Sequence, residues 1–101
     1  EKLDLTIIVS DSAAIPAGVF TQNVCCAAPV ILSKNHINSE KIKAIIVNSG
    51  NANAASGDDG YVAAIKCVEE LAIQLDCMPS EILMASTGII GVPLQADKII
   101  K

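Results

Sequence analysis

The run from Ala44 to Val47 limits the possible folds of this chain more than any other segment, because it is apolar at every position and ends abruptly at Asn48. A short run of this kind, rich in β-branched residues and bounded by turn residues, predicts a strand that is buried on both faces. We therefore place the strand, residues 43–48, in the centre of a sheet. The loop that follows, residues 48–57, contains only asparagine, serine, alanine and glycine. Such small residues allow another molecule to approach the main chain.

A second apolar run, Ile82 to Ala85, leads into Ser86, Thr87 and Gly88. It predicts another buried strand that delivers a glycine-containing loop. A β-branched hydroxyl next to glycine can present one side-chain O–H and one backbone N–H to the same point. Two such donors form an oxyanion hole, which stabilises the tetrahedral intermediate of acyl transfer. Most Ser-Thr-Gly triplets are ordinary turns, so the triplet alone favours a turn.

The remaining segments complete a predicted α/β fold in which one sheet carries both loops at the same edge. The predicted elements are strands 3–10, 17–21, 43–48 and 82–85, helices 29–37 and 58–75, and a helix from Pro93 to the end. A strand is the alternative for residues 30–32. Apolar residues of the 58–75 helix recur at spacings of three and four and form one stripe that must be buried against the sheet: Tyr61, Ile65, Val68, Ala72 and Leu75. Ser56 and Asp59 predict a capping box at its start.

Length and composition indicate a single domain, residues 1–101, and exclude several classes of function. The net charge is −4, and the seven basic residues, all lysines, form no basic stripe, which argues against nucleic-acid binding. No apolar stretch approaches the length of a membrane span. The four cysteines form no C-x-x-C pair and there is one histidine, so we expect free thiols and no metal site. This composition is typical of an intracellular, cytoplasmic protein.

Other candidate catalytic groups are unconvincing. His36 has no serine or cysteine near it in the sequence that could serve as a nucleophile, and we expect it at the surface of a helix end. Asp58 and Asp59 are a carboxylate pair, but acidic residues also stabilise the first turn of a helix, which is the favoured interpretation. The chain contains neither a G-x-S-x-G motif nor the G-K-[ST] of a phosphate-binding loop.

Four segments, in this order, resemble those of the ornithine acetyltransferase (glutamate N-acetyltransferase) family of arginine biosynthesis. The string Asn-Ser-Gly-Asn-Ala-Asn-Ala is highly specific, and the match covers nearly the whole chain. The segments are Ala17–Asn23, Ala27–Val30, Val47–Ala54 and Ala85–Gly91.

The resemblance implies a layered sheet-and-helix fold and an enzyme made as a precursor that cleaves itself before a threonine. That threonine, at the start of the second (β) chain, takes acetyl from N-acetylornithine and passes it to glutamate through an acyl-enzyme. Some members also accept acetyl-CoA, and no organic cofactor or metal is required. The oxyanion pair of the family corresponds to Thr87 and Gly88. The resemblance also implies that α and β chains pair and associate into larger oligomers.

The nucleophile and the other substrate-binding residues lie beyond Lys101 in the family pattern. The chain has no starting Met and ends inside an apolar-periodic segment, so we expect it to be the middle of the α chain. The isolated chain should then lack transferase activity and expose an apolar face. Two alternatives remain: a non-catalytic small-molecule-binding or interaction domain, and a related self-processing aminopeptidase.

Overall fold

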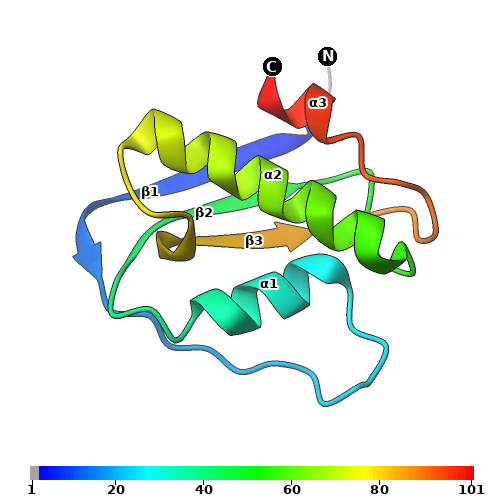
Figure 1. Ribbon diagram of the computed structural model, residues 1–101, viewed down its shortest axis with the longest axis horizontal. Coiled ribbons are helices and arrows are strands. Elements are labelled where there is room, and N and C mark those ends of the chain that lie inside the picture. The colour runs from blue at the N-terminus through cyan, green and yellow to red at the C-terminus, as the bar shows by residue number, and fades with distance from the viewer. Residues whose placement is uncertain (1–2) are drawn as a thin grey trace.

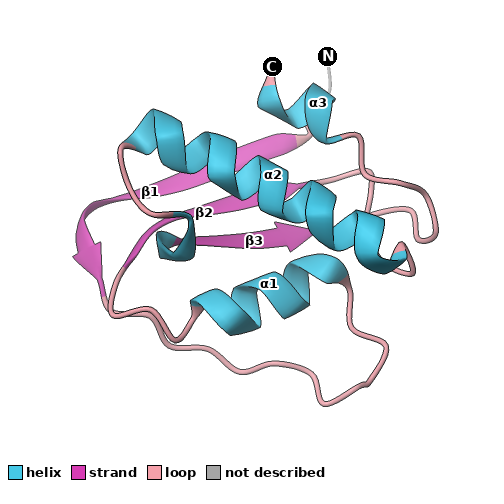
Figure 2. Cartoon of the chain, in the orientation of Figure 1, coloured by secondary structure: helices cyan, strands magenta, loops and turns pink. Residues whose placement is uncertain are grey.

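The structure is a computed structural model that describes residues 3–101. The chain folds into a mixed α/β arrangement, as predicted (Figures 1 and 2), with three helices and three strands in these residues, where the sequence predicted four strands. In chain order the elements are β1 (Leu5–Ala14), α1 (Ala28–His36), β2 (Ile42–Asn48), α2 (Gly57–Leu75), the 3₁₀ turn η1 (Pro79–Glu81), β3 (Ile82–Ser86) and α3 (Ala96–Ile100). None of the helices in the described part of the chain has the length and apolar character needed to cross a membrane.

The sheet has the strand order β1-β2-β3, so β2 is central, which confirms the prediction from its apolar run. β1 pairs with β2 in antiparallel register, with Ile7 opposite Ile46. β3 pairs with β2 in parallel register, with Met84 opposite Ile46. A parallel pair needs a crossover connection, and α2 provides it.

α2 lies across one face of the sheet and α1 runs along the outer edge of β3 (Figure 1). The hydrophobic core lies between these two helices and the sheet. Alternate residues of β2, from Ile42 to Asn48, point into this core and are buried. The predicted stripe of α2 is confirmed: Val68 and Ala72 are buried, and the other three residues are partly buried against the core. Cys67 lies beside the stripe and is also buried.

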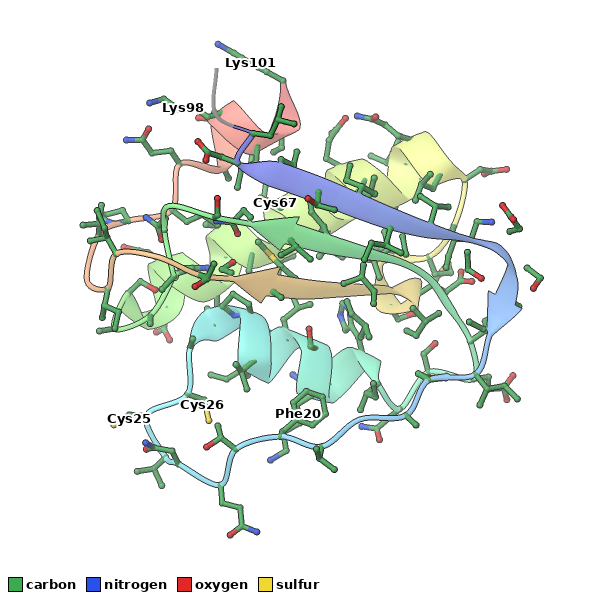
Figure 3. The ribbon with its side chains drawn as sticks, turned by 180° about the vertical axis from the view of Figure 1, so that it is seen from behind. Phe20, Cys25, Cys26, Cys67, Lys98 and Lys101 are labelled. Atoms are coloured by element: carbon green, nitrogen blue, oxygen red, sulfur yellow. The ribbon has the colours of Figure 1, made fainter. Side chains whose placement is uncertain are left out.

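The opposite face of the sheet has no helix over it among residues 3–101, as the reverse view shows (Figure 3). The register places Thr6 and Ile8 of β1 beside Val47 and Ile45 of β2 on this face, and Leu83 of β3 follows. Ile8 is 56% exposed. The predicted exposed apolar surface is therefore present, and it is the uncovered face of the sheet.

Side chains of α1 bond to the outer edge of β3. The Ser33 hydroxyl donates to the Met84 carbonyl (2.7 Å) and accepts the Met84 N–H (2.9 Å). The His36 ring nitrogen Nδ1 lies 2.8 Å from the Ile82 carbonyl. Because a carbonyl only accepts, Nδ1 carries the proton there. His36 is thus half-buried and bonded to the sheet edge, whereas the sequence predicted a surface residue.

Three local predictions are wrong. Residues 17–21 form no strand: the segment is coil and Val19 is 98% exposed. It passes beside Ile37, just after α1, instead of pairing with the open edge of β1. The last helix begins at Ala96 rather than at Pro93, whose carbonyl accepts the Asn51 side-chain amide. No capping box forms at α2, because the Ser56 hydroxyl donates to Asn53.

Candidate functional site

The two predicted loops lie side by side at one edge of the sheet, as expected for loops that follow parallel strands. The strand pairing continues into them, because Thr87 N–H donates to the Asn48 carbonyl (3.0 Å) and Ile89 N–H donates to the Gly50 carbonyl (3.2 Å). The Ala52 N–H in turn donates to the Ile89 carbonyl (3.0 Å). The position of the second loop is therefore fixed by the main chain of the first.

Gly88 is packed directly onto the main chain of the first loop. A Cβ at this position would lie 2.3 Å from the carbonyl carbon of Gly50 and 2.6 Å from the nitrogen of Asn51. Its φ of +133° is also rare for residues with a side chain. Only glycine can occupy this position without displacing the loop.

The two predicted oxyanion donors have no hydrogen-bond partner within residues 3–101. Thr87 and Gly88 are both exposed, and neither the Thr87 hydroxyl nor the Gly88 N–H is bonded. The amides on either side, those of Thr87 and Ile89, are both bonded to the first loop. A fixed peptide thus presents one free amide and one free hydroxyl to solvent.

Asn48 ties the two strand ends together from inside the core. Only 3% of its surface is exposed, because it occupies the last inward-facing position of β2. Its side-chain oxygen accepts the Ser86 hydroxyl, and its side-chain amide donates to the Asn51 carbonyl at 3.0 Å. Every buried polar side-chain atom among residues 3–101 has a partner, and this pair follows that pattern.

Asn51 and Asn53 hold the rest of the first loop. The Asn51 amide donates to the carbonyls of Val92 (3.0 Å) and Pro93 (3.2 Å), and its oxygen accepts the Asn53 N–H (2.7 Å). Asn53 is fully buried and has a φ of +48°, a conformation that asparagine tolerates. Its side chain donates to the Gly60 carbonyl at 2.8 Å.

The sequence analysis located this loop but missed the roles of its asparagine side chains. Inward alternation along β2 is the signal that could have marked Asn48, because residues 42, 44, 46 and 48 share one face. No comparable signal exists for Asn51 and Asn53, whose side-chain amides donate to main-chain carbonyls of other segments.

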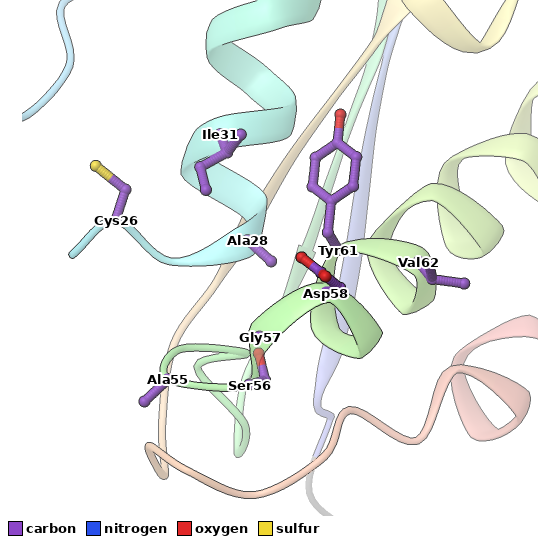
Figure 4. Close-up of a pocket in the computed structure, with 9 residues that line it drawn as sticks. All are labelled: Cys26, Ala28, Ile31, Ala55, Ser56, Gly57, Asp58, Tyr61 and Val62. Atoms are coloured by element: carbon purple, nitrogen blue, oxygen red, sulfur yellow. The ribbon is translucent and has the colours of Figure 1, made fainter. Parts of the chain in front are cut away.

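Three pockets among residues 3–101 lie close to the loops, and none of them is lined by Thr87 or Gly88; the smallest of the three, of about 350 Å³, lies between Ala55 and Gly91. One of about 530 Å³ lies between the first turns of α1 and α2, where Cys26, Ile31 and Tyr61 surround it (Figure 4). Another, of about 460 Å³, lies beside the Asn48–Asn51 segment, with Asp4 and Lys98 in its lining. The donors therefore face open solvent rather than a closed cavity.

The other titratable groups form no catalytic pair in the described part of the chain. Asp58 and Asp59 are exposed in the first turn of α2. The four cysteines are free, and burial raises the pKa of the Cys67 thiol. Among residues 3–101, no three His, Cys, Asp or Glu side chains gather in a way that could hold a metal ion.

Comparisons with known proteins give a consistent result. The profile described as the ArgJ family matches residues 1–101. The chain is 54% identical to the arginine biosynthesis bifunctional protein ArgJ 1 of Clostridium acetobutylicum over 98 residues, which are 97% of this chain and 24% of the relative. It is 46% identical to the chloroplastic ArgJ protein of Citrullus lanatus over 101 residues, which are 99% of this chain and 22% of the relative.

Two crystal structures are similar to the fold. One is the arginine biosynthesis bifunctional protein ArgJ of Bacillus halodurans, with a TM-score of 0.91 and 36% identity over 96% of this chain and 51% of that chain. The other is the ornithine acetyltransferase of Mycobacterium tuberculosis complexed with ornithine, with a TM-score of 0.89 and 34% identity over 96% of this chain and 53% of that chain. The chain spans about a quarter of the length of these curated relatives and about half of the solved chains.

Proposed function

The chain belongs to the ArgJ family of arginine biosynthesis proteins, and we propose that it forms part of an acetyltransferase that moves acetyl from N-acetylornithine to glutamate. In this proposal the reaction passes through an acyl-threonine, and residues 1–101 supply the oxyanion hole. The nucleophile and the other substrate contacts belong to the rest of the enzyme. The main support from the structure is the free Thr87 hydroxyl next to the free Gly88 N–H, between two bonded amides.

The proposed chemistry needs two donors that are already in place before charge develops. When the nucleophile attacks the acetyl carbonyl, its oxygen becomes an oxyanion, and the Thr87 hydroxyl and Gly88 N–H both donate to it. Donors that need no reorganisation at this moment stabilise the transition state most. The bonds from Thr87 N–H to Asn48 and from Ile89 N–H to Gly50 restrict the main chain in this way.

The same proposal covers the partners of the enzyme. A β chain cut from the same precursor supplies the nucleophilic threonine, and the pairs assemble into an oligomer in the cytoplasm. N-acetylornithine and glutamate are the substrates, with acetyl-CoA as a further acetyl donor in some members, and no metal or organic cofactor takes part. The isolated 101-residue chain then has no transferase activity of its own.

The test is the full-length enzyme with Thr87→Ala, assayed for acetyl exchange between N-acetylornithine and glutamate. Loss of one oxyanion donor should lower kcat by about 10²–10³-fold with little change in KM, because the bond acts mainly in the transition state. Thr87→Ser should keep much of the activity, since it keeps the hydroxyl. The control is Ser80→Ala, which removes an exposed hydroxyl near the other end of β3.

A wild-type rate for Thr87→Ala would refute the oxyanion assignment. A full-length wild-type protein that releases N-terminal amino acids from peptides, without acetyl exchange, would favour the aminopeptidase alternative. A protein with neither activity would favour a binding or interaction domain.

A further inference from the structure

We infer that Asn48 and Ser86 are positioning residues, which hold the Thr87 and Gly88 donors in place through one partly buried hydrogen-bonded connection. The inference rests on the proposed function, because it concerns the same oxyanion hole. Neither side chain reaches the proposed reacting atoms, since both face the core while Thr87 and Gly88 are exposed. Their effect would therefore act through the main chain of the two loops.

Asn48 holds the second loop through both its main chain and its side chain. Its carbonyl accepts the Thr87 N–H at 3.0 Å, and its side-chain oxygen accepts the hydroxyl of Ser86, the residue just before Thr87. Two contacts on adjacent residues restrict both the position and the rotation of the peptide between them. That peptide carries the Thr87 N–H and leads directly to the Thr87 side chain.

The same side chain also fixes the surface on which Gly88 rests. The Asn48 amide donates to the Asn51 carbonyl at 3.0 Å, and Gly88 packs against the peptide that joins Gly50 to Asn51. A shift of that peptide would move Gly88 with it, because there is no free space between them. Asn48 thus connects the supports of both donors.

The orientation of the Asn48 side chain follows from its partners. The Asn51 carbonyl can only accept, so the Asn48 amide nitrogen faces it and the oxygen faces Ser86. The Ser86 hydroxyl must then donate. An aspartate at position 48 could still accept from Ser86 but would bring a second acceptor to the Asn51 carbonyl, so only an amide serves both loops.

The Ser86–Asn48 hydrogen bond could also be purely structural, and a double-mutant cycle on kcat separates the two roles. The experiment compares full-length Ser86→Ala, Thr87→Ala and the double variant, at a temperature where circular dichroism shows each to be folded. Ser86→Ala should lower kcat by about 10–100-fold with KM nearly unchanged, since small misplacements of reacting groups cost this much. In the Thr87→Ala background the same change should cost clearly less, because one of the donors that it positions is already gone.

The control is Ser33→Ala, which removes a buried serine hydroxyl that bonds to β3 at Met84, two residues before Ser86. It should lower stability and leave kcat unchanged. Ser86→Thr keeps the hydroxyl and should restore most of the lost kcat. Should Ser86→Ala not fold, Ser86→Cys keeps the side-chain volume with a weaker donor and gives the same comparison.

Equal effects of Ser86→Ala in both backgrounds, or a wild-type kcat for Ser86→Ala, would overturn the positioning role. If Thr87→Ala lowers kcat as expected, that outcome leaves the proposed function standing. A wild-type rate for Thr87→Ala would instead refute the oxyanion assignment. Absence of acetyl exchange in the full-length wild-type protein would refute the proposed function itself, so the failures are distinguishable.

Discussion

Replacing Gly88 by alanine should disrupt the contact between the two loops more than any other single methyl group added there. The new Cβ would lie 2.3 Å from the Gly50 carbonyl carbon and 2.6 Å from the Asn51 nitrogen, which are main-chain atoms. Overpacking of this kind costs about 1–3 kcal/mol. The φ of +133° adds about 1–3 kcal/mol for a residue with a side chain. The sum, about 2–6 kcal/mol, is a large part of the stability of a typical domain, about 5–15 kcal/mol.

Gly91→Ala is the matched control, because Gly91 lies in the same loop, has a φ of +78° and has no atom within 4 Å of its would-be Cβ. It should show the conformational cost alone, about 1–3 kcal/mol. The two full-length variants are compared by denaturant unfolding and by hydrogen exchange of the Thr87 and Ile89 amides, which donate across the loops. Exchange should be faster in Gly88→Ala only.

If Gly88→Ala is no less stable than Gly91→Ala, and both amides stay equally protected, the close contact between the loops does not exist. The first loop would then not hold Thr87 and Gly88 in place.

Three further predictions concern other parts of the chain. Ser33→Ala should lower the free energy of unfolding by about 1–3 kcal/mol and speed amide exchange at Met84, because both main-chain groups of Met84 lose a buried partner. In the native protein an alkylating reagent should modify exposed Cys25 quickly and Cys67 slowly, because Cys67 is buried and burial raises the pKa of its thiol. Mass spectrometry after denaturation should find all four thiols free. A backbone N–H bond and a nearby lysine lower the pKa of Glu81 from its ordinary 4.5, so its stabilisation is complete above that pH and is lost as the pH falls through the lower folded value. Glu81→Gln should therefore be less stable than wild type at neutral pH, and urea titrations should show this difference vanish in acid.

The elements that the sequence predicted well are those whose pattern is local. The apolar run that ends at Asn48 indicated a central strand, and the stripe through Val68 and Ala72 indicated a helix packed on a sheet. The strand predicted at residues 17–21 is absent because composition can favour an extended chain but does not determine whether that chain pairs with a sheet edge. The prediction that the last helix starts at Pro93 failed because a distant side chain, that of Asn51, donates to the Pro93 carbonyl.

The candidate site shows the same limit. Strand endings and glycine placed both loops at one sheet edge, which the parallel pairing of β2 and β3 confirms. The hydrogen bonds from Asn48 to Ser86 and Asn51 depend on the register between strands that are far apart in sequence. The assignment of Thr87 and Gly88 as oxyanion donors came from a family resemblance, and it stays a prediction.

The hydrogen bonds from Ser33 and His36 to β3 occupy one edge of the sheet, so a further strand can be added only at the other edge. A sheet with two open edges can gain strands on either side, but here one edge already has a helix in the place of a neighbour. Within residues 3–101, β1 pairs on one side only, so its outer edge is where a further strand could be added. Two side chains of a short helix thus decide the side on which the architecture can be widened, by recombination or by design. Removing both the Ser33 hydroxyl and the His36 imidazole would expose the edge of β3 as well, with the risk of unwanted strand pairing between molecules.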